Sequence, residues 1–284
     1  MKIIENQNFP EERALYGVDE VELKNCTFQG EEDGESALKE ARNVSLKDCY
    51  MALRYPLWHD ENVSLERVEM TATCRAALWY SHRVVAKNCK LHGIKAIREC
   101  SDIELIDTSV ISPEFGWRNH RIVGKNLSVE GEYAFFESSH LNFKNLALKG
   151  KYSFQYVHDL VIEDSNLDTK DAFWHTKNVL VKNSVIKGEY LAWYAENITF
   201  ENCTIIGTQP LCYCKGLKLI NCKMLDCDLS FEYSEVEADV VGTITSVKNP
   251  KSGKIVADAY GEIILTDDSK VRCEAQIITR GANL

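Results

Sequence analysis

The sequence predicts an all-β fold, a parallel β-helix of about twelve coils with about 19 residues in each coil. Three observations lead to this prediction. A corner residue, mostly Asn or Asp, recurs at a fixed step along the chain. Apolar columns alternate with polar ones on both sides of that corner. No part of a repeat shows helical spacing, and leucine does not dominate, which disfavours a leucine-rich repeat.

The repeat is clearest in the middle of the chain, where each step between corners is 19 residues. Eight corner positions follow that step: Asn88, Asp107, Asn126, Asn145, Asp164, Asn183, Asn202 and Asn221. Three earlier corners continue the series at steps of 21, 19 and 23 residues: Arg67, Asp48 and Asn25. A fixed period near this length indicates one coil of a solenoid per repeat.

The residues around each corner predict two strands. Apolar residues stand four and two positions before the corner, with polar residues between them, as in a strand with one buried face. The apolar positions after the corner are the first and the third, so the inward parity changes there. Asn and Asp tolerate the left-handed backbone angles that such a corner needs. We expect the corner amides to point inward and to hydrogen-bond from rung to rung.

A second corner and a third strand complete the predicted coil. Glycine fills six of the eleven positions that lie five residues after the first corner: Gly30, Gly93, Gly131, Gly150, Gly188 and Gly207. The third segment follows, as in residues 77–80 and 191–194. Extra residues of the first and third repeats are expected in loops, around residues 31–34 and 71–75.

The Asn corner, the stacked apolar columns and the coil length resemble the single-stranded right-handed β-helix of the pectate-lyase-like superfamily, over roughly residues 12–240. The overall pattern resembles an uncharacterised bacterial group within that superfamily. This resemblance implies a right-handed parallel β-helix. Because the repeat fades after residue 235, we expect one domain over residues 1–284, with an N-terminal cap (1–12), regular coils (13–235), and a last coil and C-terminal cap (236–284).

Composition excludes several classes of function. The net charge is -10, and charges of both signs are spread along the chain, so no nucleic-acid partner is expected. No apolar run is long enough for a membrane span. The first residues lack the apolar stretch of a signal peptide, which predicts a cytoplasmic protein. Five of the 11 cysteines occupy the position after the corner, so we expect most thiols to be reduced and buried.

Large aromatic and charged side chains gather in two adjacent columns at the end of the third segment. All five tryptophans of the chain stand in the first of these columns. The candidate ligand-binding residues are Trp58, His59, Trp79, Tyr80, Arg98, Trp117, Tyr156, Trp174, His175, Trp193, Tyr194 and Tyr213. Three interpretations remain open at this stage: an exposed groove, an aromatic core, or a subunit interface.

An exposed row of aromatic rings beside charged groups suits sugars, because ring faces stack on sugar C–H surfaces and fixed polar groups bond hydroxyls. The resemblance also implies polysaccharide binding or cleavage. The leading hypothesis is therefore a carbohydrate-binding or carbohydrate-processing protein with an oligosaccharide ligand. The alternative is a non-enzymatic structural or interaction module that binds a protein or a second copy of itself as a homodimer.

Three consecutive charged residues of the second column are the catalytic candidates: Glu99, Arg118 and Glu137. Two carboxylates two rungs apart fit a glycoside hydrolase, and lyase chemistry is the other enzymatic option. The competing interpretation is an ion-pair ladder, in which Arg118 lowers both carboxyl pKa values.

Nothing in the sequence indicates a bound metal or another cofactor. Neither active site of the superfamily is present, because the chain has no Gly-His-Gly element and no repeated Asp cluster in its coils. The histidines are scattered, and His82, His120 and His158 stand two rungs apart in one column. The clustered cysteines between residues 203 and 227 fall on different sides of the coil.

Overall fold

The computed structural model describes residues 1–30 and 34–281. Every regular element in these two ranges is a β-strand, and neither range holds a helix that could cross a membrane. The chain forms two compact units, Met1–Ala147 and Leu148–Leu284. Strand β16 (Ser139–Lys151) contains the boundary between them.

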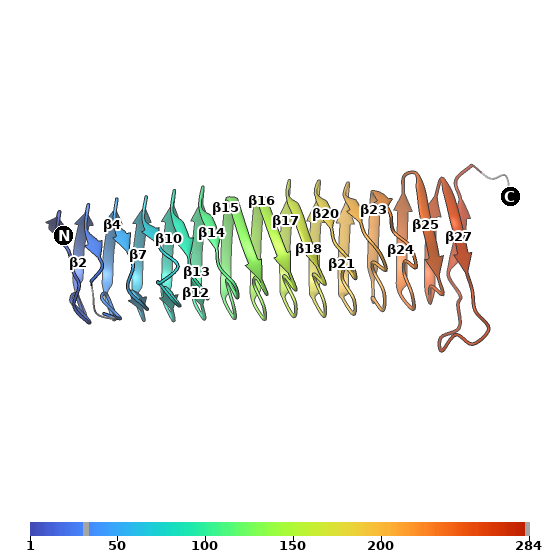
Figure 1. Cartoon of the computed structure of the whole chain (residues 1–284). Helices are drawn as coiled ribbons and strands as arrows, with labels where there is room; N and C mark the ends of the chain where they lie inside the picture. The colour runs from blue at the N-terminus through green and yellow to red at the C-terminus, as the bar shows by residue number, and fades with distance from the viewer. Residues whose placement is uncertain (31–33, 282–284) are drawn as a thin grey trace. The chain divides into compact units, whose positions relative to one another are not determined.

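The first unit is a stack of parallel rungs (Figure 1). Its longest strands form one sheet, here called the long-strand sheet: β1 (Lys2–Glu5), β2 (Asp19–Lys24), β4 (Arg42–Lys47), β7 (Glu61–Glu66), β10 (His82–Lys87), β13 (Ser101–Ile106) and β15 (His120–Glu132). Shorter strands follow the corner: β3 (Thr27–Phe28), β5 (Tyr50–Met51), β8 (Glu69–Met70), β11 (Lys90–His92) and β14 (Ser109–Ile111). The third segment supplies three strands: β6 (Leu57–Trp58), β9 (Leu78–Trp79) and β12 (Ile97–Arg98).

The second unit is also a stack of parallel rungs (Figure 1). Its main strands are β17 (His158–Glu163), β19 (Lys177–Lys182), β21 (Glu196–Glu201), β23 (Leu217–Leu225), β24 (Glu235–Val240), β26 (Ser252–Ala257) and β28 (Gln276–Thr279). The others are β18 (Asn166–Lys170), β20 (Val185–Lys187), β22 (Thr204–Ile206), β25 (Thr243–Lys248) and β27 (Ala259–Ile264).

The pairing register confirms the parallel solenoid. Val84 of β10 lies between Val63 of β7 and Ile103 of β13, one repeat before and one after it. In the second unit, Val179 of β19 likewise lies between Leu160 and Ile198. The inward columns predicted from the sequence are buried in both units, and ten of the eleven free cysteines are buried with them.

The solenoid has about fourteen turns, where the sequence predicts about twelve. Strands occur in residues 1–12, expected as the N-terminal cap, and in residues 236–284, expected as the last coil and C-terminal cap. Strand β1 pairs with β2 in register, Ile4 beside Leu23, and so adds a rung at the start. Strands β26 and β28 continue the sheet after β24, and β27 pairs with β25. Their spacing departs from 19 residues, which is why the sequence repeat fades although the coiling continues.

The corner residues adopt left-handed angles as predicted, for example Asn126 at a φ of 55° and Asn202 at 53°. They also form the predicted rung-to-rung bonds: Asn145 Nδ2 donates to Asn126 Oδ1 at 2.9 Å. The expected inward direction of these amides is wrong, because every corner side chain in the column is exposed. The inward positions on each side of the corner are already filled by apolar residues, so the ladder runs along the outer surface.

The second corner needs glycine because the coils approach closely there. A Cβ on Gly207, whose φ is 131°, would lie 2.3 Å from the carbonyl oxygen of Gly188 in the preceding rung. A Cβ on Gly131 would lie 2.2 Å from the carbonyl oxygen of Ser112. Of the two predicted insertions, residues 71–75 form turns, and residues 31–33 lie outside the described part of the chain.

The third segment forms strands only in part of the chain. Residues 57–58, 78–79 and 97–98 pair as β6, β9 and β12, but residues 171–175 form turns. Phe173 and His175 take positive φ values of 60° and 56°, as does Asp171 at 53°. Left-handed residues at alternate positions cannot keep the extended backbone of a strand, so a third strand in every coil was an overprediction.

Candidate functional site

The predicted aromatic column of the first unit lies at the surface, but its ring faces are covered. Trp58 and Trp79 are half-buried and stack on each other, with ring centroids 5.3 Å apart and planes 12° apart. The ammonium group of Lys39 lies 3.9 Å from the Trp58 ring, and Arg98 lies 5.4 Å from the Trp79 ring. Neither indole therefore offers a free face for stacking on a sugar.

Trp117 is held in a similar way. Its Nε1 donates to the carbonyl oxygen of Tyr133 at 2.7 Å, and its ring packs on Phe136 with centroids 5.1 Å apart. Lys95 lies 5.8 Å from the ring. The indole is half-buried, so its role in this structure is to brace the corner.

In the second unit, exposed rings of the neighbouring column stack face to face. His175 lies between Tyr156 and Tyr194, with centroids 4.9 Å from each and planes within 6°. Tyr194 in turn stacks on Tyr213 at 4.7 Å. The rings of one column thus occupy each other's faces and present their edges and hydroxyls outward.

The tryptophans of the second unit lie beside this column and are half-buried. Trp174 and Trp193 are stacked, with centroids 5.4 Å apart and planes 3° apart. Their Nε1 atoms donate to the carbonyl oxygens of Tyr190 and Gln209, at 2.6 and 2.8 Å. Trp174 and Trp193 are therefore neither freely exposed nor part of the fully buried core.

The three catalytic candidates form a row of ion pairs. Arg118 Nε lies 2.7 Å from Glu137 Oε2, and its Nη1 lies 3.9 Å from Glu99 Oε1. Partial burial raises the pKa of Glu99, but hydrogen bonds from Tyr80, Trp79 and Arg98 outweigh it and hold that pKa below its ordinary value. The hydrogen bond to Glu137 raises the pKa of Arg118. Glu99 is thus an ionised carboxylate at neutral pH, which does not suit a general acid.

An interior polar column was missed by the sequence analysis. Asp60 and Asn119 are fully buried, and their Oδ1 atoms accept from the backbone N–H groups of Ala41 and Cys100 in the preceding rungs, at 2.9 and 2.7 Å. Burial raises the pKa of Asp60 to about 8. The signal was present in the sequence, since most members of this column stand twelve residues after a corner: Asp60, Cys100, Asn119 and Ser138.

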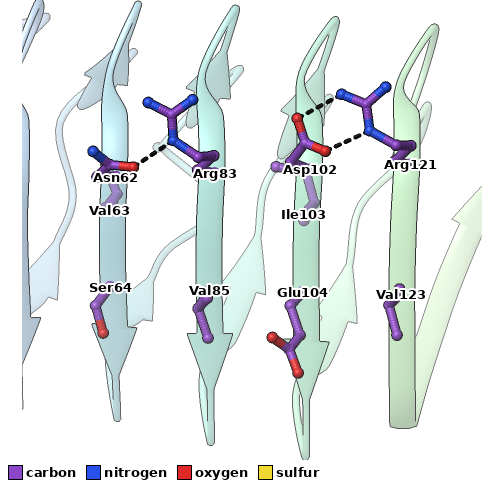
Figure 2. A pocket seen from close by; sticks show the side chains of 10 residues that line it. All are labelled: Asn62, Val63, Ser64, Arg83, Val85, Asp102, Ile103, Glu104, Arg121 and Val123. Atoms are coloured by element: carbon purple, nitrogen blue, oxygen red, sulfur yellow. Dashed lines mark hydrogen bonds and ion pairs between the residues drawn. The ribbon is translucent and has the colours of Figure 1, made fainter.

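A depression of the first unit lies on the outer face of the long-strand sheet, across β7, β10, β13 and β15. Its volume is about 730 Å³. One edge is a row of polar side chains, one from each strand: Asn62, Arg83, Asp102 and Arg121 (Figure 2). A second row, from the position two residues later on each strand, lies below it: Ser64, Val85, Glu104 and Val123 (Figure 2). We call this depression the sheet groove.

The polar edge of the sheet groove is fixed by bonds between rungs. Arg83 Nε donates to Asn62 Oδ1 at 2.5 Å, and Arg83 also pairs with Glu61. The hydrogen bonds from Arg121 hold the pKa of Asp102 below its usual range. The floor is partly apolar, with Val85 38% and Val123 52% exposed. Rigid polar groups beside exposed apolar side chains are the usual makeup of a binding site.

The sequence analysis did not identify this groove. Its polar edge belongs to a second outer column with left-handed backbone angles, five residues before each corner, which follows the same steps as the corners: Asn43, Asn62, Arg83, Asp102 and Arg121 in the first unit. The repeat therefore held a signal for it. The exposed valines gave no such signal, because valine is common in strands and a single apolar residue at an outward position is ordinary.

Comparisons with known proteins add a family and distant structural similarity. The family described as "Protein of unknown function (DUF3737)" matches residues 2–278. No curated protein matches the chain. Several solved structures do match. Three of them, described next, are each 11% or less identical to this chain.

The A-module of the mannuronan C-5 epimerase AlgE4 from Azotobacter vinelandii is 11% identical, with 84% of this chain and 89% of that chain covered and a TM-score of 0.35. The pentapeptide repeat protein HetL from the cyanobacterium Nostoc sp. strain PCC 7120 is 11% identical, with coverages of 78% and 92% and a TM-score of 0.33. The periplasmic alginate epimerase AlgG is 8% identical, with coverages of 92% and 77% and a TM-score of 0.33. Similarity at this level does not bear on activity.

Proposed function

The chain belongs to the DUF3737 family, and we propose that it is a carbohydrate-binding protein without catalytic activity, which holds a linear oligosaccharide in the sheet groove of its first unit. One observation carries the proposal: a rigid row of hydrogen-bonding side chains runs beside exposed valines across four adjacent strands. A sugar ring has hydroxyls at its rim and C–H groups on its faces, so this arrangement matches both parts of it.

In the proposed complex, the polar side chains of the groove bind sugar hydroxyls and its valines contact sugar C–H groups. Arg83 and Arg121 offer guanidinium N–H donors beyond those used in the rung-to-rung bonds, and Glu104 offers carboxylate acceptors. Val85 and Val123 receive the C–H faces. Because neighbouring rungs lie about 4.8 Å apart, four strands offer a track long enough for several linked sugars.

The groove fits an oligosaccharide better than the aromatic columns do. The indoles of Trp58 and Trp79 and the rings around His175 stack on one another, so a sugar would have to break those contacts before it could use a ring face. In the sheet groove Val85 and Val123 are already exposed, so a sugar could cover them without breaking any stacked pair.

Binding fits better than catalysis because two carboxylates of the first unit, Glu99 and Asp102, are held in the ionised form. The pKa of Glu99 and that of Asp102 both lie below their ordinary values. An inverting or retaining glycosidase needs one carboxylic acid whose pKa is raised. We also propose that the protein acts in the cytoplasm.

A protein-interaction module is the second candidate. Tyr156 and Tyr194 of the second unit are large side chains with 48% and 44% of their surface exposed. Exposed tyrosines in a row are typical of protein interfaces. Measurement of the solution mass at several concentrations tests self-association through this column. A dimer that dissociates in the variant Tyr156→Ser/Tyr194→Ser would favour this candidate.

The test of the proposed function is a calorimetric titration of the chain with a panel of neutral and acidic oligosaccharides. Val123→Glu places a charge on the groove floor and should weaken binding at least tenfold. Val185→Glu is the matched control, since Val185 is a 39% exposed strand valine of the second unit. A panel without any binder, or equal losses in both variants, would reject the proposal.

A further inference from the structure

A second depression lies in the first unit at the corner that joins the third segment to the long-strand sheet. Its volume is about 540 Å³, and it is lined by Arg42, His59, Tyr80 and His82. His59 and Tyr80 end the third segment of two consecutive coils, and His82 begins β10. Two imidazole rings from neighbouring rungs thus share one depression.

The first imidazole lies against a carboxylate. His59 Nδ1 is 3.3 Å from Glu40 Oε1, within ion-pair distance. A hydrogen on Nδ1 would face this oxygen, so the carboxylate favours the neutral tautomer whose lone pair is on Nε2. The ring is braced edge-on by Tyr80 and Trp58, with centroids 5.2 and 5.7 Å away.

The second imidazole has the same tautomer for a related reason. His82 Nδ1 lies 2.8 Å from Ser101 Oγ. Ser101 Oγ donates its hydrogen to Asp102 Oδ2 at 3.2 Å, so it accepts from His82. Nε2 of His82 is therefore again the atom with the lone pair. Within residues 1–30 and 34–281, neither Nε2 atom hydrogen-bonds to the protein.

This is the arrangement that orients a metal ligand. Histidines that bind metals usually donate their other N–H to a carboxylate or another oxygen, which fixes the ring and raises its basicity. The charge of Arg42 does not prevent a cation from binding, because that guanidinium is paired with Glu40 at 3.4 Å and with Glu61 at 3.6 Å.

We propose that this depression binds one divalent first-row transition-metal ion through Nε2 of His59 and Nε2 of His82, with solvent completing the coordination. Imidazole nitrogen suits Zn²⁺, Cu²⁺ and Ni²⁺. The sequence analysis expected no metal, because it compared histidines within one column. His59 and His82 belong to different columns that meet at the corner.

The test is Cu²⁺ binding to the untagged chain, followed by calorimetry and by electron paramagnetic resonance. The wild type should bind an ion with two coupled nitrogens. His59→Gln and His82→Gln should each remove that two-nitrogen signal. Glu40→Gln should weaken the affinity about 10- to 100-fold, because it frees the His59 ring.

His92→Gln is the matched control, since His92 is a histidine of the same unit on β11 and lies outside this depression. It should leave the signal and the affinity unchanged. Circular dichroism of the metal-free variants verifies that each is folded. An unchanged two-nitrogen signal in both folded variants His59→Gln and His82→Gln, or no coupled nitrogen pair in the wild type, would overturn the proposal.

Discussion

Arg121 of β15 binds Asp102 of β13 through two hydrogen bonds, Nε to Oδ1 at 2.5 Å and Nη2 to Oδ2 at 2.7 Å (Figure 2). The planar guanidinium matches the carboxylate, so both side chains are fixed across two rungs. This pair forms one end of the polar edge of the sheet groove, and it links the regular coil to the proposed binding function.

Arg121→Lys tests that link. Lysine keeps the charge but cannot form the two-point contact. Because the pair is exposed, the free energy of unfolding should change little in chemical denaturation. The affinity for an oligosaccharide bound by the wild type should fall several-fold, because lysine has fewer N–H donors than arginine to share between Asp102 and the sugar. Equal affinity in the two proteins would remove Arg121 from the binding site.

Glu99→Gln and Glu137→Gln distinguish binding from catalysis. Each variant breaks ion pairs with Arg118, so a small loss of stability is expected. Oligosaccharide affinity should stay within twofold of the wild type, since neither residue lines the sheet groove. Glycan turnover by the wild type that disappears in both variants would contradict the assignment of a non-catalytic protein.

Asp60 predicts how stability depends on pH. Its pKa is about 8 in the folded chain, because of burial, and about 3.9 in an unfolded chain. The contribution of its neutral form is fully present below pH ~4 and is lost as the pH rises through ~8. The free energy of unfolding should therefore decrease between these pH values. Asp60→Asn cannot ionise and should flatten the decrease.

Chemical denaturation at a series of pH values measures this effect. Asp107→Asn is a suitable control, because Asp107 belongs to the exposed corner ladder, where it accepts from Asn126. Its pH profile should keep the slope of the wild type. The assignment fails if Asp60→Asn retains the full slope.

Gly207→Ala tests the close approach at the second corner. Its Cβ would lie 2.3 Å from the Gly188 carbonyl oxygen, in addition to the cost of a φ of 131°. Gly17→Ala is the comparison, since Gly17 also has a positive φ, 65°, but a Cβ added there would meet no atom within 4 Å. We expect thermal unfolding to show a loss of about 1 kcal/mol for Gly17→Ala and a clearly greater loss for Gly207→Ala. Equal losses would mean that the coils can separate at this corner without cost.

The coil could be predicted from the sequence because its determinants repeat. Each inward column is visible as apolar residues at a constant distance from Asn88, Asp107 and the later corners, and a one-residue slip would expose the whole column. The direction of the corner amides was not visible. Whether Asn126 points in or out depends on which neighbouring positions fill the interior, and that is a property of the packed coil.

The functional surface was harder to predict for a physical reason. The repeat alignment placed the tryptophans in one column. It did not show that rings at the same position of neighbouring rungs stack on each other and so cover each other's faces, as Trp174 and Trp193 do. The sheet groove depends on valines such as Val123 that look ordinary in a strand. His59 and His82 belong to different columns, which meet at a corner of the coil. An alignment that compares residues within one column does not show that they line the same depression.

The measurement that tests the central claim most directly is the crystal structure of the chain with the tightest-binding oligosaccharide of the panel. The account predicts sugar rings over Val85 and Val123, with hydroxyls bonded to Arg83 and Arg121. Sugar bound instead along Trp58 and Tyr80, or along His175 and Tyr194, would contradict it.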